Sequence, residues 1–406
     1  MSVEKLGFSK DEKESQYMGS RDDFGFALVL VIAALTAIFS ACDQVQQLLR
    51  PGSPQMDGLG EEISIGLVYP ITGRLASVGM EMRRGFELAR EEINNSQLGD
   101  TKLRYITEDS RGDPEGAVEA FNKLIQQDGV SVILGPGSSS AAEAAFPIAQ
   151  QSRVVAISAT AAARGLSEIG DFAFRTILTT DVLITSGIAA TQAKLGYQKA
   201  AIVYDETDLF SADGAEVMRD TLTRNGVEIL TTETFQSGDS DFSAQLRRIK
   251  NFNPDVIFVS ALPPDKPEIL IQADKIGIPD SVTFIINTLT IADVLAAGHS
   301  ADGAIAFTSW ADTADTPGNG VYVQKYSAKY GSAPSIWAAQ AYATIHILAN
   351  ATSEIPSTDS TAIRDALANT TDLDTILGKF SFDAVGDAVY DPVVLIVENG
   401  ELRVFE

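Results

Sequence analysis

Short apolar segments alternate with amphipathic helical stretches along the chain from residue 63 onward. The segment 63–69 is typical of a strand, and 80–93 carries apolar residues at helical spacing. Continuous apolar segments such as 130–134 are typical of strands that are buried on both faces of a parallel sheet. The same alternation starts again at 200–204. Strands that alternate with helices indicate βαβ units, so we predict an α/β fold with two doubly wound parallel-sheet lobes.

The composition agrees with a folded body and limits its partners. Hydrophobic residues make up 45% of the chain and charged residues 21%, which is typical of a globular protein. The roughly 345 residues after the first sixty exceed what one core usually fills, so two lobes are expected. The formal net charge of −25 argues against a nucleic-acid partner, because neutralising phosphates requires clustered Lys and Arg.

An apolar segment spans residues 24–39 and is followed directly by Ser40-Ala41-Cys42. At about 16 residues it is shorter than the roughly 20 that a membrane-spanning helix needs, and it fits the core of a signal peptide. Cys42 is the only cysteine in the chain, and its surroundings resemble the lipobox of bacterial lipoproteins. We therefore predict a lipoprotein signal peptide at 1–41, lipidation of Cys42 and a flexible tether at 42–61. The alternative is a buried or stray thiol behind an uncleaved anchor, and the leader has more acidic than basic residues, unlike most signal peptides.

Residues that could support catalysis or bind a metal are scarce. The two histidines, His299 and His346, have no partner ligand at metal spacing, and no Walker-type phosphate loop is present. The segment 135–140 lacks the Gly-x-Ser-x-Gly pattern of a serine hydrolase, and no base accompanies it. We therefore expect no enzyme activity, no metal site and no cofactor.

Three serines at 138–140 follow a strand and a glycine turn and begin a predicted helix. A helix N-terminus presents unpaired N–H groups and a partial positive charge, and serine hydroxyls add donors. This pattern indicates an anion site suited to a carboxylate, with plain helix capping by Ser138 or Ser139 as the alternative. Ser158 and Thr160 follow the next strand, so their polar groups are expected to face the same crevice beyond the strand ends.

Short motifs in a consistent order run through the chain from 63 to 400. They include Ile65-Gly66-Leu67, Thr72-Gly73, Arg84-Gly85-Phe86, Asp113-Pro114, Gly135-Pro136, Tyr204-Asp205, Asp241-Phe242-Ser243, Pro254-Asp255 and Gly378-Lys379-Phe380. No single motif is diagnostic, but their series is. With this series the chain resembles the leucine/isoleucine/valine-binding protein family, the type I periplasmic binding proteins of branched-chain amino acid ABC transporters.

The resemblance implies a Venus-flytrap fold, in which two lobes joined by three crossover strands close on a ligand without changing it. It implies a first lobe at 62–177 and 310–381, and a second lobe at 178–309 and 382–406. The implied partners are a small-molecule ligand, an ABC transporter permease and, through the lipid anchor, the membrane of the cell envelope. The protein would then face the periplasm or the exterior.

The ligand contacts of this family are only partly kept in the sequence. The serine that binds the ligand carboxylate in this family corresponds to Ser139, which is flanked by Ser138. A backbone group that contacts the ligand ammonium corresponds to that of Thr160. Ala162 takes the place of a second, threonine contact, and no acidic residue at 286–290 could pair with an ammonium. The implied ligand-binding residues are Ser138, Ser139, Ser158, Thr160, Val78 (in the place of an aromatic residue), Asp208, Phe210 (in the place of a tyrosine) and Asn287.

These residues predict an extracytoplasmic lipoprotein that captures a small polar ligand for an ABC importer: an amino acid, an amide or a related carboxylate. A free branched-chain amino acid fits these binding residues poorly, because burying an ammonium without a carboxylate partner costs roughly several kcal/mol. The alternative is an envelope lipoprotein of the same fold that acts as a ligand sensor or a protein-binding regulator. An open, polar crevice favours the first function, and a crevice plugged by apolar side chains favours the second.

Overall fold

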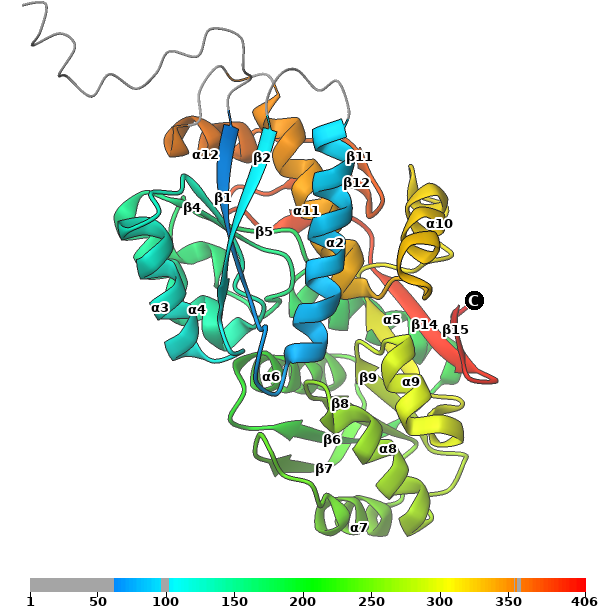
Figure 1. Cartoon of the computed structure of the whole chain (residues 1–406). Helices are drawn as coiled ribbons and strands as arrows, with labels where there is room; N and C mark the ends of the chain where they lie inside the picture. Colours follow the sequence, from blue (N-terminus) through cyan, green and yellow to red (C-terminus); the bar gives the residue numbers. More distant parts are fainter. Residues whose placement is uncertain (1–61, 96–101, 354, 356–358) are drawn as a thin grey trace, which may run out of the picture. The chain divides into compact units, whose positions relative to one another are not determined.

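The computed structural model describes residues 62–95, 102–353, 355 and 359–406, and two large β-sheets organise this part of the chain (Figure 1). The predicted signal peptide, Cys42 and the predicted tether lie outside the described residues. None of the described helices is long and apolar enough to cross a membrane. In the same described part, no group of His, Cys, Asp and Glu could hold a metal ion.

The first sheet and its helices come from the N-terminal part of the described chain. Their elements are β1 (Glu62–Tyr69), α2 (Ala76–Asn95), β2 (Lys102–Asp109), α3 (Pro114–Gln126), β3 (Val132–Leu134), α4 (Ser139–Ser152), β4 (Val155–Ser158), the 3-10 turn η1 (Ser167–Ile169) and β5 (Ala173–Arg175). The five strands are parallel, in the order β2-β1-β3-β4-β5. In β1, Leu67 packs in one core with α2, and its neighbour Val68 packs in another with α3 and α4. Both faces are therefore buried, which explains the continuous apolar segments in the sequence.

The second sheet has seven strands, in the order β15-β14-β10-β9-β8-β6-β7. Its elements and helices are α5 (Thr180–Leu195), β6 (Lys199–Asp205), α6 (Leu209–Arg224), β7 (Glu228–Phe235), α7 (Ser243–Phe252), β8 (Val256–Ser260), α8 (Asp265–Ile276), β9 (Thr283–Asn287), α9 (Ile291–Ala297), the 3-10 turn η2 (Gly298–Ala301), β10 (Ile305–Thr308), β14 (Val393–Glu398) and β15 (Glu401–Val404). Helices α5 and α6 pack on one face, and α7, α8 and α9 pack on the other. The predicted α/β class with two doubly wound lobes is confirmed.

The second sheet is not parallel throughout, because its last two strands run against the rest. Strand β14 pairs antiparallel with β10 and then turns back into β15. The turn is at Asn399 and Gly400, both of which have positive φ angles, 54° and 76°. Asn-Gly is the preferred pair for this type of hairpin turn.

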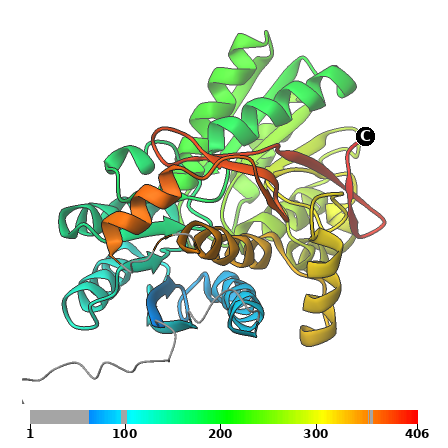
Figure 2. The same cartoon turned by 90° about the horizontal axis from the view of Figure 1, so that it is seen from above.

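After β10 the chain returns to the first sheet. It forms α10 (Asn319–Tyr330), α11 (Ile336–Thr352), α12 (Ser360–Ala368) and a small antiparallel sheet of β11 (Leu373–Thr375), β12 (Gly378–Phe382) and β13 (Ala388–Val389). Helix α11 runs beside α2 (Figures 1 and 2). The two helices approach closely at Gly85, where a Cβ atom would lie 2.1 Å from the carbonyl oxygen of Ala338.

The chain passes three times between the two large sheets: after β5, after β10 and before β14. Phe382, Ala388 and Tyr390 pack in the same core as the first sheet. The small sheet of β11, β12 and β13 therefore shares the core of the first sheet.

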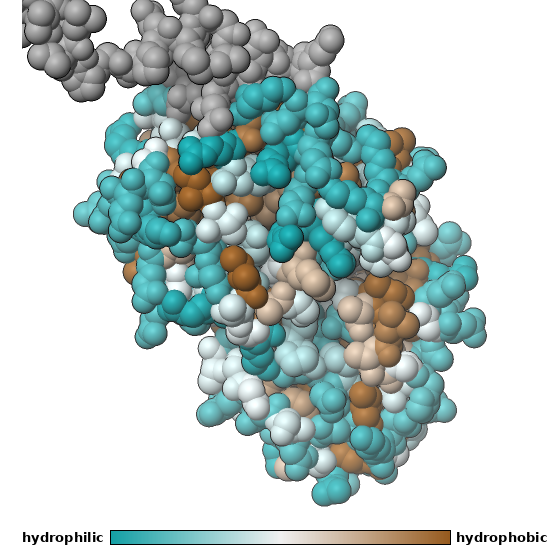
Figure 3. Space-filling view, viewed as in Figure 1, coloured by the Kyte–Doolittle hydropathy of each residue, from teal (hydrophilic) through white to brown (hydrophobic). Residues whose placement is uncertain are grey.

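The described residues combine buried apolar cores with a polar surface. Buried apolar side chains cover both faces of each large sheet. The face of the molecule in Figure 3 is mostly hydrophilic, with apolar residues in scattered patches, as the acidic composition leads one to expect.

Candidate ligand-binding site

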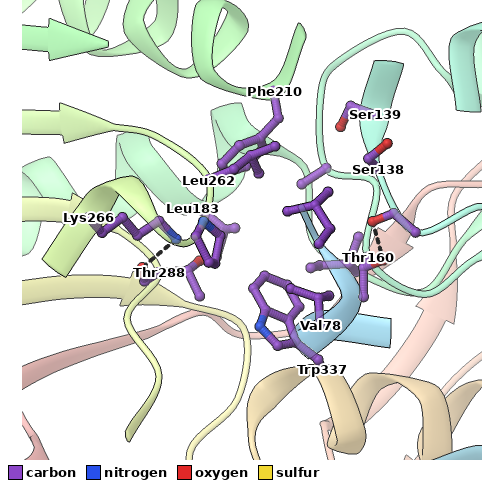
Figure 4. Close-up of a pocket in the computed structure, with 15 residues that line it drawn as sticks. Val78, Ser138, Ser139, Thr160, Leu183, Phe210, Leu262, Lys266, Thr288 and Trp337 are labelled. Atoms are coloured by element: carbon purple, nitrogen blue, oxygen red, sulfur yellow. Dashed lines mark hydrogen bonds between the residues drawn. The ribbon is translucent and has the colours of Figure 1, made fainter. Parts of the chain in front are cut away.

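A cavity lies where loops and helices from both large sheets meet (Figure 4). Most of its lining follows the carboxyl ends of parallel strands, which is where open α/β sheets place their ligand sites. Both sheets contribute: β1, β3, β4 and β5 on one side, and β8 and β9 on the other. The lining residues are Leu75, Val78, Gly137, Ser138, Ser139, Thr160, Ala162, Ile177, Leu183, Phe210, Leu262, Pro263, Lys266, Thr288 and Trp337.

The start of α4 supplies hydrogen-bond donors to this cavity. Ser138 is the N-cap residue, and its hydroxyl accepts from the amide of Ala141 at 3.4 Å. The hydroxyl of Ser139 accepts from the amide of Ala163 at 3.2 Å. Among the described residues both hydroxyls only accept, so each keeps its own hydrogen for a ligand. The first N–H groups of a helix also have no partner within it, and together these donors favour an anion or a carbonyl oxygen.

The third serine of the motif makes a different contact. The hydroxyl of Ser140 donates to Asp208 at 3.2 Å and accepts from the amide of Leu209 at 3.1 Å. Asp208 is the N-cap of α6, so this pair connects α4, beside the first sheet, to α6, beside the second. Burial raises the pKa of the Asp208 carboxyl, although its hydrogen bonds with Ser211 act in the opposite direction.

Five of the eight predicted ligand-binding residues line the cavity: Ser138, Ser139, Thr160, Val78 and Phe210. Thr160 lies beside the start of α4, because its hydroxyl donates to the carbonyl of Gly137 at 2.8 Å. Val78 and Phe210 add apolar surface from α2 and α6.

The other three predicted residues, Ser158, Asp208 and Asn287, do not line it. Their polar groups hold the surrounding loops instead. The Ser158 hydroxyl donates to the carbonyl of Pro136 at 2.7 Å and accepts from the amides of Thr160 and Ala161. Asp208 caps α6, and the amide nitrogen of Asn287 donates to the hydroxyl of Ser260 at 2.9 Å.

The sequence analysis missed Lys266, the one charged residue in the described lining. It is the second residue of α8 and is only 1% exposed. Its Nζ atom donates to the carbonyl oxygen of Thr288 at 2.9 Å, as Figure 4 shows. Burial lowers the pKa of Lys266 from its ordinary value near 10.5, against the opposing attraction of Asp293, Asp265 and Asp208.

Thr288 presents its carbonyl oxygen to Lys266 from an unusual backbone conformation. Its φ angle is 63°, in the left-handed region that β-branched residues rarely occupy. The conformation is held by the next strand, because the Thr288 amide donates to the carbonyl of Phe307 at 3.0 Å. Strain of this kind persists where the surrounding structure fixes a functional geometry.

Apolar side chains form most of the remaining wall. Leu183, Leu262 and Trp337 also escaped prediction, since each reads as an ordinary core residue in its own segment. In Figure 4 the Trp337 ring and the Phe210 ring lie on opposite sides of the cavity. The cavity therefore combines an apolar wall with donors at Ser138, Ser139 and Lys266.

Ion pairs join the two halves of the site around the cavity. Arg74, in the loop after β1, forms a bidentate pair with Asp265 at the start of α8, with both N–O distances 2.9 Å. Arg164, after β4, pairs with Asp213 at 2.7 Å and with Glu216 at 2.8 Å, both on α6. Elements of the first sheet therefore contact elements of the second on more than one side of the cavity.

Comparison with known proteins gives matches over almost all of the described chain. A family model for periplasmic binding proteins matches residues 62–397. The Leu/Ile/Val-binding protein BraC3 of Rhizobium johnstonii is 26% identical over 337 residues, which cover 80% of this chain and 89% of that protein.

Two solved structures have the same fold. The branched-chain amino acid transporter substrate binding protein LivJ of Streptococcus pneumoniae, in complex with isoleucine, has a TM-score of 0.78 and 27% identity, covering 85% of this chain and 98% of that chain. A solute binding protein of an ABC transporter from Rhodopseudomonas palustris BisB5, in complex with 3,4-dihydroxybenzoic acid, has a TM-score of 0.78 and 24% identity, covering 84% and 95%. The relatives that the chain resembles include Leu/Ile/Val-binding proteins, as its motifs indicated. The family match spans both sheets and the cavity lining, so this chain belongs to the periplasmic binding protein family.

Proposed function

We propose that this protein is an extracytoplasmic receptor that captures a small organic ligand in the cavity and delivers it to an ABC importer. The observation that carries the proposal is a single cavity lined from both sheets, with the donors of Ser138 and Ser139 on one side and Lys266 on the other. Relatives with this fold hold isoleucine in one structure and 3,4-dihydroxybenzoate in another. Both ligands carry a carboxylate, the group that the start of α4 is suited to bind.

Capture requires that the ligand contacts both halves of the site at once. A ligand that bridges them stabilises the closed arrangement, because its contacts exist only when the two halves are together. The pairs Arg74–Asp265 and Arg164–Asp213 would add to closure, since each joins one half to the other. The three passages of the chain between the sheets would act as the hinge.

The proposal includes an envelope location. The leader at 1–41 would be removed, Cys42 would be lipidated, and the segment 42–61 would tether the receptor to the membrane. From that position the receptor would meet a permease partner. The lobe limits expected from the sequence remain part of this proposal: a first lobe at 62–177 and 310–381, and a second lobe at 178–309 and 382–406.

A thermal-shift screen tests the receptor function. The ligands to be tested are amino acids, amides, urea, small peptides and aromatic and aliphatic acids. A ligand at about 100 times its dissociation constant adds about 2.7 kcal/mol of stability, which is readily visible as a higher melting temperature. A tight ligand should also reduce the radius of gyration in small-angle scattering at saturation. If no compound raises the melting temperature, the solute-receptor function is wrong and the protein-binding regulator becomes the better account.

A further inference from the structure

Lys266 is a buried lysine that forms no ion pair with any residue that the structure describes. At 1% exposure its ammonium has lost nearly all of its water, and its single hydrogen bond among the described residues goes to the neutral carbonyl of Thr288. An ammonium has three N–H donors, so two remain for another acceptor. A buried charge is costly unless it is paired and hydrogen-bonded, and the protein itself supplies only part of that.

The carboxylates nearest to Lys266 are engaged elsewhere. Asp265 is held by the guanidinium of Arg74 in a bidentate pair. Asp293 forms a capping box with Thr290 at the start of α9. None of the described carboxylates forms an ion pair with Lys266, and none lines the cavity.

The third nearby carboxylate, Asp208, is also committed. It caps α6 through the amide and the hydroxyl of Ser211, at 2.9 and 2.8 Å. It accepts a further hydrogen bond from Ser140. Among the described lining residues, the cavity in front of Lys266 therefore has one basic side chain and no acidic one.

The remaining donors are on another side of the same space. Figure 4 shows Lys266 and Thr288 on one side of the cavity, and Ser138, Ser139 and Thr160 on the other, with apolar side chains between them. An α-amino acid would bring a second ammonium into this space without a carboxylate to receive it. An acid without an ammonium would instead supply the missing negative partner.

From this arrangement we propose that the ligand is an apolar organic acid without an ammonium group. One of its oxygen groups binds Lys266, another binds the donors at the start of α4, and its branched or aromatic carbon skeleton packs between Trp337 and Phe210. The inference rests on the receptor function proposed above and names the class of ligand. Lys266 is then the residue that selects acids against amino acids.

Matched pairs of compounds that share a carbon skeleton test this selection. Isothermal titration calorimetry would compare 4-methyl-2-oxopentanoate with L-leucine, phenylpyruvate with L-phenylalanine, and benzoate with benzylamine. We expect at least one of the acids to bind, and its nitrogen-bearing partner to bind at least about 100-fold more weakly, because the partner's ammonium would be unpaired beside Lys266.

The variant Lys266→Met keeps an unbranched apolar side chain, one atom shorter than that of lysine, and removes the charge. It should weaken acid binding by about 10- to 150-fold, the range for a lost hydrogen bond to a charged group. The matched control is Lys275→Met, an exposed position on the same helix, which should leave the affinity unchanged. Circular dichroism of each variant verifies that it is folded.

The outcomes separate the ligand class from the receptor function. Tight binding of the amino acids, or unchanged acid affinity in folded Lys266→Met, overturns the ligand class and leaves the receptor function standing. If no compound of either kind binds, the ligand class is overturned, and the broader screen described above then decides whether the receptor function falls with it. If Lys266→Met does not fold, the titrations of the matched compound pairs with the wild-type protein decide the ligand class.

Discussion

Replacing Lys266 by methionine also isolates the effect of its buried ammonium on folding. Burial lowers the Lys266 pKa below 10.5, and the attraction of Asp293, Asp265 and Asp208 offsets only part of this effect. The unfolded chain therefore binds the Lys266 proton more tightly than the folded chain. At pH values between the folded-state pKa and 10.5 the unfolded state carries more protons, so the stability of the wild-type protein rises with pH in this window.

The magnitude follows from one proton. In the difference between the unfolding free energies of the wild type and Lys266→Met, the contributions of all groups that titrate equally in both proteins cancel. It should be constant below the folded-state pKa and then rise in favour of the wild type by up to about 1.4 kcal/mol per pH unit. At neutral pH the variant escapes the desolvation cost but leaves the Thr288 carbonyl without its donor, which costs about 1–3 kcal/mol. These terms oppose each other, so the pH slope is the informative quantity.

Urea unfolding followed by circular dichroism, from about pH 6 to about pH 10, measures this difference. The exposed control, Lys275→Met, should show no slope relative to the wild type. A difference for Lys266→Met that stays flat over the whole range would refute the reasoning, because Lys266 would then titrate as if it were in water.

Three further predictions concern the helix start, the helix packing and the leader. Ser139→Ala should weaken ligand binding about ten- to a hundred-fold without unfolding the protein. The control Ser152→Ala, at the exposed end of the same helix, should leave the affinity unchanged. If calorimetry shows unchanged affinity for Ser139→Ala, Ser139 has only a structural role. Gly85→Ala should destabilise the fold by about 1–3 kcal/mol, since its Cβ would lie 2.1 Å from a backbone oxygen of α11, while Gly320→Ala, in open space on α10, should be neutral or stabilising in urea unfolding. Mass spectrometry of the native protein should find a lipid-modified N-terminal Cys42, and an intact Met1 would contradict this.

The fold could be predicted because its signals are local. Each strand of a parallel sheet that is buried on both faces is a continuous apolar segment, and each covering helix shows helical spacing. Helix starts are equally local: Asp113 caps α3 with Pro114 at the first position, a pair of adjacent residues typical of a helix start. The packing of Phe382 and Tyr390 in the core of the first sheet, in contrast, depends on contacts that are distant in sequence.

The site could be predicted only in part, for the same reason. Ser138 and Ser139 could be predicted at the site because a helix start and its capping residues are adjacent in the sequence. Asn287 was expected at the ligand, but its side-chain amide bonds Ser260, and the next residue, Thr288, lines the cavity from a left-handed backbone conformation that the sequence does not reveal. Lys266 was missed because nothing in its own segment shows that the carboxylates around it are held by other partners.

The most direct test of the account is a crystal structure of the protein with the acid that binds most tightly in calorimetry. The account predicts the acid in the cavity, with one oxygen within hydrogen-bonding distance of Lys266 Nζ and another at the hydroxyls or amides of Ser138 and Ser139. An acid bound outside this cavity, or bound within it with Lys266 still directed only at Thr288, would contradict the account.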